Sequence, residues 1–398
     1  MPSETLTAIP ASPPKAGALT FALLFTLESL VRSLNAGVMS VQAYDLLHSS
    51  RNVSILSFMA SASVLLTTLS LPYALRRMRR RWAYTLGIVI SALAALSLAT
   101  HTVPGQAAGQ YLRSTGAAVM AVTMSLYILD HIHKSDYARA EPLRLAFSTI
   151  AWSVGPAAGL WLYTHHGIVT TQSAVVGAAL LLALVFWIIR LTDPITLPSG
   201  TLQPFHPVKN IRRFAAQPRL RLAWSIALCR SAFWSALFIY GPILLIEGGL
   251  SKTQGGYLIS ASQMMLPLAL VFGWIARRVG VRAVIGSCFA VMAVAALAAG
   301  LVGTHAPVVT IVLLLFGAAA ATGLDGIGGI PYMRAVKPRE RREMTSVYRT
   351  FIECSELGPG IVFALVLSFL PTASVYVIVS LIAAGMSFLA WRHLPKSL

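Results

Sequence analysis

The chain has 398 residues, of which 56% are hydrophobic and only 11% are charged. A soluble domain has about 25% charged residues, so this chain lacks the polar surface that water requires, while its hydrophobicity excludes a disordered chain. Lys and Arg outnumber Asp and Glu by 31 to 13, a formal net charge of +18. Because such an excess is typical of proteins that bind nucleic acid or an anionic surface, the positions of the charges decide the class.

The N-terminal residues 1–18 are polar and Pro-rich, and they lack the basic start and short apolar core of a cleaved signal peptide. We therefore expect a disordered cytoplasmic tail. Cys229, Cys288 and Cys354 lie singly in apolar stretches, which favours buried thiols. Nothing in the sequence is typical of a metal site, a cofactor site or a nucleophile–base pair, so we expect no metal, no cofactor, no catalytic residue and no enzyme activity.

Beyond the tail, the chain divides at its polar and Gly/Pro-rich breaks into apolar segments long enough to cross a bilayer as helices, which takes roughly 20 residues. A membrane β-barrel would alternate apolar and polar residues instead. We predict an all-α membrane protein with twelve transmembrane helices, near 19–46, 53–75, 82–103, 105–130, 143–164, 169–191, 220–246, 253–276, 282–303, 306–333, 344–370 and 372–391.

Lys and Arg collect in every second connection between these segments, whereas the other connections contain only Arg51 and Lys252. Because basic connections stay on the cytoplasmic side, both termini are predicted to be cytoplasmic. The basic residues then form a girdle that meets anionic lipid, which explains the net charge without a nucleic-acid partner. We expect a monomeric, multi-pass protein of the bacterial inner membrane.

The two halves of the chain repeat one another. Three matches recur in the same order at offsets of 201, 201 and 203 residues: 72–81 with 273–282, Gly116-Ala-Ala with Gly317-Ala-Ala, and Gly155-Pro156 with Gly358-Pro359. Repeats at one offset fix an architecture. We predict two six-helix bundles, 19–191 and 220–391, joined by a cytoplasmic linker at 192–219 and followed by a cytoplasmic tail at 392–398.

These features resemble the major facilitator superfamily over nearly the whole chain. That resemblance implies two six-helix bundles around a central site that opens alternately to either side. The family's basic loop motif, Gly-x-x-x-Asp-Arg-x-Gly-Arg-Arg, has partial copies here that include Arg77 and Arg278, which the resemblance implicates in gating. The acidic position of the motif is occupied by Arg76 in the first copy and by Arg277 in the second.

Segment 5 contains Gly155-Pro156-Ala-Ala-Gly159, which resembles the Gly-Pro-x-x-Gly motif of the family's proton-coupled drug antiporters. The resemblance implies export and a bend in the helix, repeated in segment 11 at Gly358 and Pro359. Glycine admits close helix approach and proline removes a backbone hydrogen bond, so packing alone is the alternative.

Ionisable residues inside apolar segments are the candidate functional residues, because burying their charge is costly. Glu28, Arg32 and Asn35 follow i, i+4, i+7 spacing and so share one helix face. A rise of about 1.5 Å per residue places Glu28 roughly 13 Å and Arg113 roughly 18 Å from the inner face, so the two are expected to meet. Glu28 is our candidate proton carrier with Arg113 as partner. A structural i, i+4 pair of Glu28 and Arg32 is the alternative.

The C-terminal half offers further charges. Glu356 is a second proton-coupling candidate, and Glu353 beside it either faces the cavity or pairs with Arg349. Asp325 lies late in segment 10, where gating, loop anchoring and substrate contact are all open. Arg230 has no acidic residue within one turn, so it either pairs across the cavity or binds an anionic group of the substrate.

Aromatic residues of segments 5, 7 and 11 supply a candidate substrate surface, although belts at the membrane interface account for many such residues. The predicted cavity residues are Arg32, Asn35, Trp152, Arg230, Phe233, Trp234, Phe238, Tyr348 and Glu353.

Together these residues favour a secondary active transporter that exports a small amphipathic compound in exchange for protons. The alternative is a symporter or exchanger of an organic anion that uses Arg32, Arg113 and Arg230 as counter-charges. In either case the expected partners are a small-molecule substrate, protons and membrane lipid.

Overall fold

The computed structural model describes residues 18–75, 78–131, 137–189, 207–337 and 340–395. These residues form sixteen α-helices and no strand. In chain order the helices are α1 (Ala18–Leu34), α2 (Val38–Leu47), α3 (Ser50–Leu75), α4 (Arg80–Ala99), α5 (Val103–His131), α6 (Tyr137–Ile189), α7 (Pro207–Ala215), α8 (Pro218–Glu247), α9 (Lys252–Met264), α10 (Leu268–Val279), α11 (Val281–Val302), α12 (Pro307–Ile327), α13 (Ile330–Ala335), α14 (Arg341–Arg349), α15 (Phe351–Val366) and α16 (Ser374–His393).

Apart from α7, the helices coincide with the predicted segments, although several segments are interrupted. Segments 5 and 6 are the two parts of α6, which separate at Gly167, where φ is +78°. Segments 1, 8, 10 and 11 are each a pair of helices divided by a break. Within the described part of the chain, seven helical stretches are long and apolar enough to cross a membrane, and α9 with α10, bent by 41°, is an eighth candidate.

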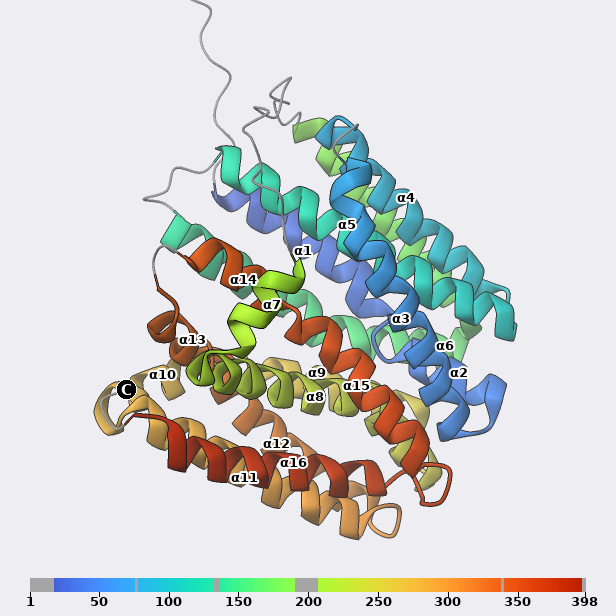
Figure 1. The fold of residues 1–398 in the computed structure, drawn as a ribbon. Coiled ribbons are helices and arrows are strands. Elements are labelled where there is room, and N and C mark those ends of the chain that lie inside the picture. Colours follow the sequence, from blue (N-terminus) through green and yellow to red (C-terminus); the bar gives the residue numbers. More distant parts are fainter. Residues whose placement is uncertain (1–17, 76–77, 132–136, 190–206, 338–339, 396–398) are drawn as a thin grey trace, which may run out of the picture.

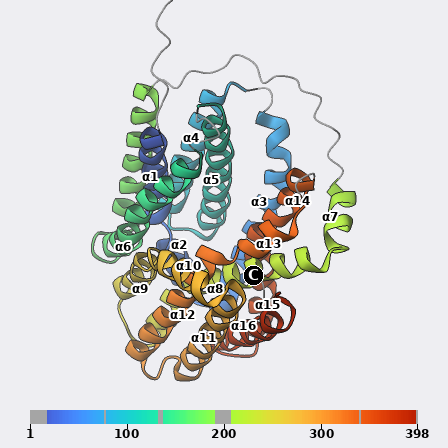
Figure 2. The same ribbon diagram turned by 90° about the vertical axis from the view of Figure 1, so that its left-hand side faces the viewer.

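The helices form two groups (Figures 1 and 2). α1–α6 occupy the upper and right-hand part of Figure 1, and α1, α4, α5 and α6 surround one apolar core that includes Leu24, Tyr84 and Leu182. In the second group, α8–α12, α15 and α16 surround a larger core that includes Phe289 and Tyr376. Between the groups, α6 packs on α9 and α3 packs on α15. These contacts join segment 5 to segment 8 and segment 2 to segment 11. Because segments 5 and 11 correspond in the repeat, as do segments 2 and 8, the two contacts are equivalent under a two-fold symmetry of the halves.

The two ends of the molecule differ in charge. The end with the α3–α4, α5–α6, α10–α11 and α13–α14 connections is here named the basic end, because about half of the 31 Lys and Arg residues lie in or beside those connections in the sequence. The other, here named the opposite end, has the α2–α3, α8–α9 and α15–α16 connections.

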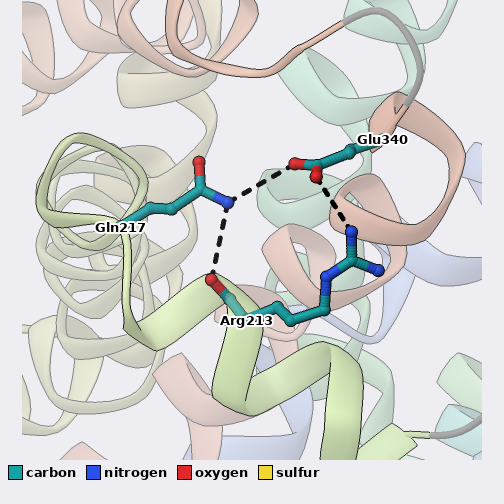
Figure 3. A network of polar contacts seen from close by, with 3 residues as sticks. All are labelled: Arg213, Gln217 and Glu340. Carbon is teal, nitrogen blue, oxygen red and sulfur yellow. Dashed lines mark hydrogen bonds and ion pairs between the residues drawn. The ribbon is translucent and has the colours of Figure 1, made fainter.

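The predicted linker 192–219 contains a helix, α7, although the stretch is rich in proline, which disfavours helices. Residues 192–206 and the termini at 1–17 and 396–398 lie outside the described residues. Phe214 of α7 is buried against Tyr332 and Val347. Arg213 Nη2 lies 2.8 Å from Glu340 Oε1, and Gln217 Nε2 donates to Glu340 Oε2 at 3.5 Å (Figure 3). The connection between the halves is therefore attached to α13 and α14.

Candidate functional site

A charge pair from the N-terminal half lies at the centre of the site. Glu28 of α1 is completely buried, and its Oε1 lies 3.9 Å from Nη1 of Arg32, one turn later. The hydroxyl of buried Tyr84 on α4 donates to Glu28 Oε2 at 3.4 Å. The Arg32 side chain is 32% exposed, and its guanidinium carbon lies 5.9 Å from the ring centroid of Trp152 on α6. Arg32 thus connects a buried carboxylate to a partly exposed aromatic side chain.

Asn35 does not share this position, contrary to the sequence analysis. Its amide exchanges two hydrogen bonds with Gln172 of α6, at 3.1 and 2.9 Å, and both side chains are buried. Asn35 directly follows the last residue of α1, and both polar groups of its amide are taken up by Gln172. Asn35 joins segments 1 and 6, and its partner Gln172 was overlooked although it is a polar residue within an apolar segment.

A second charge pair comes from the C-terminal half. Arg230 Nε of α8 lies 3.1 Å from Asp325 Oδ1 of α12, and Trp234 Nε1 donates to Asp325 Oδ2 at 3.0 Å. Because Arg230 and Trp234 are one turn apart on α8, one carboxylate binds both. The guanidinium carbon of Arg230 also lies 5.6 Å from the ring centroid of Phe351. Of the alternatives left open for Arg230, the structure shows pairing across helices.

Three aromatic side chains join the two charge pairs. Trp152 of α6 meets Phe238 of α8 edge to face, with ring centroids 5.9 Å apart, and Phe238 lies 6.2 Å from Trp234. All three are partly exposed. We name these residues the aromatic bridge. The bridge connects Arg32 in one half to Asp325 in the other, so it crosses the interface between the halves.

Two further aromatic candidates lie elsewhere. Phe233 is completely buried in the core of the C-terminal half, where a Cβ on Gly317 would come within 2.8 Å of its ring. It packs the core and has no exposed surface toward a cavity, which corrects its assignment as a cavity residue. Tyr348 is partly exposed, stacks on Tyr332 at 4.0 Å and meets Phe351 at 5.3 Å, so it borders the Arg230 side of the site.

Several predicted residues stay untested. Arg113 is partly exposed on α5, and its meeting with Glu28 stays a prediction. Arg349 and Gly358 are exposed, and Arg278 lies on the Trp274 ring, 3.9 Å from its centroid, at the basic end. Arg77 and the side chains of Glu353, Glu356 and Pro359 lie outside the described residues.

The Gly-Pro-x-x-Gly stretch lies between α1 and α9. A Cβ on Gly155 would come within 2.0 Å of Ser33 Oγ, and one on Gly159 within 1.9 Å of the Leu34 carbonyl oxygen. On the other side, the Pro156 carbonyl oxygen would be 2.8 Å from a Cβ on Gly256 of α9. The stretch therefore packs α6 tightly within its own half and against the other half.

At the opposite end, polar side chains connect the halves. Lys252 Nζ of α9 lies 2.5 Å from Asp45 Oδ2 of α2, and the Tyr163 hydroxyl donates to the same oxygen at 2.6 Å. The Lys252 ammonium also lies 5.1 Å from the centroid of the Tyr163 ring. We name these three residues the Asp45 cluster. Asp45 was overlooked, although an acidic residue within an apolar segment is a signal.

A second group lies beside it. Glu247 Oε1, at the end of α8, accepts from Ser50 Oγ at 2.8 Å and from Thr372 Oγ1 at 2.9 Å, and the two hydroxyl oxygens lie 2.7 Å apart. One turn further along α3, Ser54 is bonded to the Tyr240 hydroxyl at 2.7 Å. Together with the Asp45 cluster, these bonds hold α2 and α3 to the C-terminal half.

We expect Asp45→Asn to loosen the opposite end. The asparagine still accepts a hydrogen bond from Tyr163 but no longer neutralises Lys252. The loss costs about 1–2 kcal/mol and raises the fraction of molecules in which this end is open by about five- to thirtyfold. Hydrogen–deuterium exchange should therefore quicken in α2 and in the first turn of α9. Arg51→Gln, at an exposed residue of the same end, is the matched control. Equal exchange in both variants would contradict a closing role for the cluster.

The fold has known relatives. The family model of the Major Facilitator Superfamily matches residues 21–353. A POT family transporter in complex with 5-aminolevulinic acid is similar in structure, with a TM-score of 0.73 at 13% identity over 95% of this chain and 97% of that chain. A comparison with curated proteins found no match to this sequence.

Two further solved structures have the same fold. The nucleoside transporter NupG, solved as a point mutant, has a TM-score of 0.69 at 15% identity, covering 94% of this chain and 98% of its own. A bacterial homologue of the iron transporter ferroportin, in an inward-facing state, has a TM-score of 0.70 at 14% identity with the same coverage. Identities this low show the fold alone, whereas the family match covers most of the chain. The chain belongs to the major facilitator superfamily and is an integral, multi-pass membrane transporter.

Proposed function

We propose that this protein is a secondary active transporter that exports a small amphipathic compound in exchange for protons. The observation that carries the proposal is the aromatic bridge between the halves, with Glu28 and Arg32 at one end and Arg230 and Asp325 at the other. A site made from both halves changes whenever the halves move, which is what alternating access requires.

Proton coupling is assigned to Glu28. A buried carboxylate is costly when charged, and the nearby Arg32 guanidinium offsets that cost. Protonation of Glu28 removes this attraction and frees Arg32 to act elsewhere. Because Arg32 also contacts Trp152, the proton at Glu28 and the occupant of the aromatic bridge influence one another through a single side chain.

The direction of opening is inferred from the Asp45 cluster and the Glu247 hydrogen bonds. These contacts close the opposite end, so we infer that this conformation releases and accepts compounds at the basic end. With that end cytoplasmic, as its Lys and Arg content indicates, both termini are cytoplasmic as well. We propose the bacterial plasma membrane, a monomer, and the two halves 19–191 and 220–391 as the moving units.

The alternative, a symporter or exchanger of an organic anion, is favoured by one observation only. This function would use Arg32, Arg113 and Arg230 as counter-charges for the anion, but Arg230 is neutralised by Asp325. The observation in its favour is that the buried Nε of Arg32 donates to none of the described residues. The two functions differ in the direction of proton movement relative to the substrate.

The test is a flux assay in proteoliposomes. The purified protein is reconstituted, a pH gradient is imposed, and a panel of labelled neutral, anionic and cationic amphipathic compounds is followed together with the internal pH. Substrate and protons moving in opposite directions support the proposal. Movement in the same direction supports the alternative, and no solute movement above that of protein-free liposomes contradicts both. Collapsing the gradient with an ionophore is the control.

A further inference from the structure

The four charged side chains at the aromatic bridge are not equally available to a ligand. Glu28 has no exposed surface. Asp325 already accepts from both Arg230 and Trp234, and the Arg230 side chain is only 16% exposed. Arg32 differs, because its side chain is 32% exposed and its ion pair with Glu28, at 3.9 Å, is longer than a hydrogen bond.

One donor of Arg32 has no acceptor within the described part of the chain. Among the described residues, none accepts a hydrogen bond from its buried Nε. A guanidinium offers five donors in a planar fork, and a carboxylate satisfies two of them at once. Burial of an unused donor is costly, so the site gains from a ligand that brings an acceptor. Arg32 is therefore the place for an anionic group.

The surface next to Arg32 is aromatic. Trp152 lies between Arg32 and Phe238 and is partly exposed, as is Phe238. Phe238 meets Trp152 at 5.9 Å, a spacing at which aromatic rings attract one another. When the halves part, a planar ring from a ligand satisfies Trp152 in the same way as Phe238 does here.

The charge balance limits the ligand further. Arg32 carries a single positive charge, so one carboxylate of a ligand balances it, whereas a second negative charge would only add repulsion from Glu28. A cation would need Asp325, whose two oxygens are both occupied. We propose that the transported compound is an aromatic monoanion, whose carboxylate binds Arg32 and whose ring stacks on Trp152. This inference rests on the proposed function and names its substrate class.

Three probes that share one ring test the inference. Indole-3-acetate is anionic, tryptophol neutral and tryptamine cationic. Isothermal titration calorimetry with the full-length protein in nanodiscs should give a dissociation constant for indole-3-acetate at least about tenfold below that of tryptophol, since a hydrogen-bonded charge contributes that much. Tryptamine should bind most weakly. A preference for tryptamine, equal affinities, or no saturable binding would overturn the inference.

Variants separate the charge from the ring. Arg32→Gln should remove the preference for indole-3-acetate over tryptophol, whereas Arg32→Lys, which keeps the charge but not the planar fork, should retain part of it. Trp152→Leu should weaken both probes. Arg392→Gln is the matched control, because Arg392 also lies 5.9 Å from an aromatic ring, that of Phe388, but is exposed at the end of α16. An unchanged preference in Arg32→Gln would overturn the assignment.

The experiments distinguish a failure of the substrate assignment from a failure of the proposed function. If indole-3-acetate binds selectively but no flux follows the pH gradient, the proposed function is wrong and the assignment of Arg32 stands. If proton-linked export occurs only for compounds without a negative charge, the assignment is wrong and the proposed function stands.

Discussion

Replacing Glu28 with Gln is expected to abolish transport driven by a pH gradient. Glutamine has nearly the same shape and still accepts a hydrogen bond from Tyr84, but it binds no proton in the physiological range. Arg32, 3.9 Å from the carboxylate, then faces a neutral amide in every conformation. The exchange between proton and substrate, which requires Glu28 to be charged in one state and neutral in another, is lost.

Proteoliposome flux at imposed pH gradients measures this effect, and the gradient-driven component should fall to the level of protein-free liposomes. Glu340→Gln is the matched control, because Glu340 is an acidic residue that pairs with Arg213 away from the aromatic bridge. Gradient-driven flux that survives in Glu28→Gln would remove Glu28 as the proton carrier and move attention to Glu356.

The same variant shows whether Glu28 carries the proton or only neutralises the charge of Arg32. If Glu28 only compensates Arg32, its loss leaves the partly exposed Arg32 charge uncompensated, at a cost below the roughly 3–5 kcal/mol of a fully buried pair. The melting temperature then changes more than the pH dependence of transport. The double variant Glu28→Gln/Arg32→Gln would then recover stability. If Glu28 carries the proton, the double variant remains without gradient-driven flux even where stability recovers.

Local patterns explain which parts were foreseen. The apolar segments were found because bilayer thickness fixes their length, and the charge spacing of Glu28 and Arg32 was found because one helix turn is a local relation. Arg230 and Asp325 lie on different helices, and no local spacing brings them together. The division into halves depends on the repeat, which relates segment 5 to 11 and segment 2 to 8, and it stays a prediction.

The predictions that differ from the structure also have physical causes. Asn35 was assigned to the cavity by helix periodicity, but its buried amide is bonded to Gln172 of another helix, a partner that no local spacing indicates. Phe233 was grouped with its neighbours Trp234 and Phe238, but adjacent helical residues point about 100° apart, and Phe233 faces the core. Asp45 was overlooked because its partners, Lys252 and Tyr163, become visible only once the halves are packed together.

Gly159→Ala is expected to destabilise the N-terminal half by about 1–3 kcal/mol, the usual cost of overpacking. The added Cβ would lie 1.9 Å from the carbonyl oxygen of Leu34, which belongs to the backbone of α1 and has no rotamer with which to yield. α1 and α6 must therefore separate, and α1 includes Glu28 and Arg32. Glycine at such a close helix contact is what membrane packing selects.

Gly177→Ala supplies the control on the same helix, because no atom lies within 4 Å of its Cβ position. There, alanine should be neutral or stabilising, since it favours the helix by up to about 1 kcal/mol over glycine. Melting in detergent, followed by tryptophan fluorescence, compares the two variants, and equal melting temperatures would contradict the packing assignment.

Flux measurements then distinguish the two interpretations of the Gly-Pro-x-x-Gly motif. Packing alone predicts that stability and transport fall together, whereas a role in antiport predicts that a Pro156→Ala variant melts normally but no longer couples export to protons.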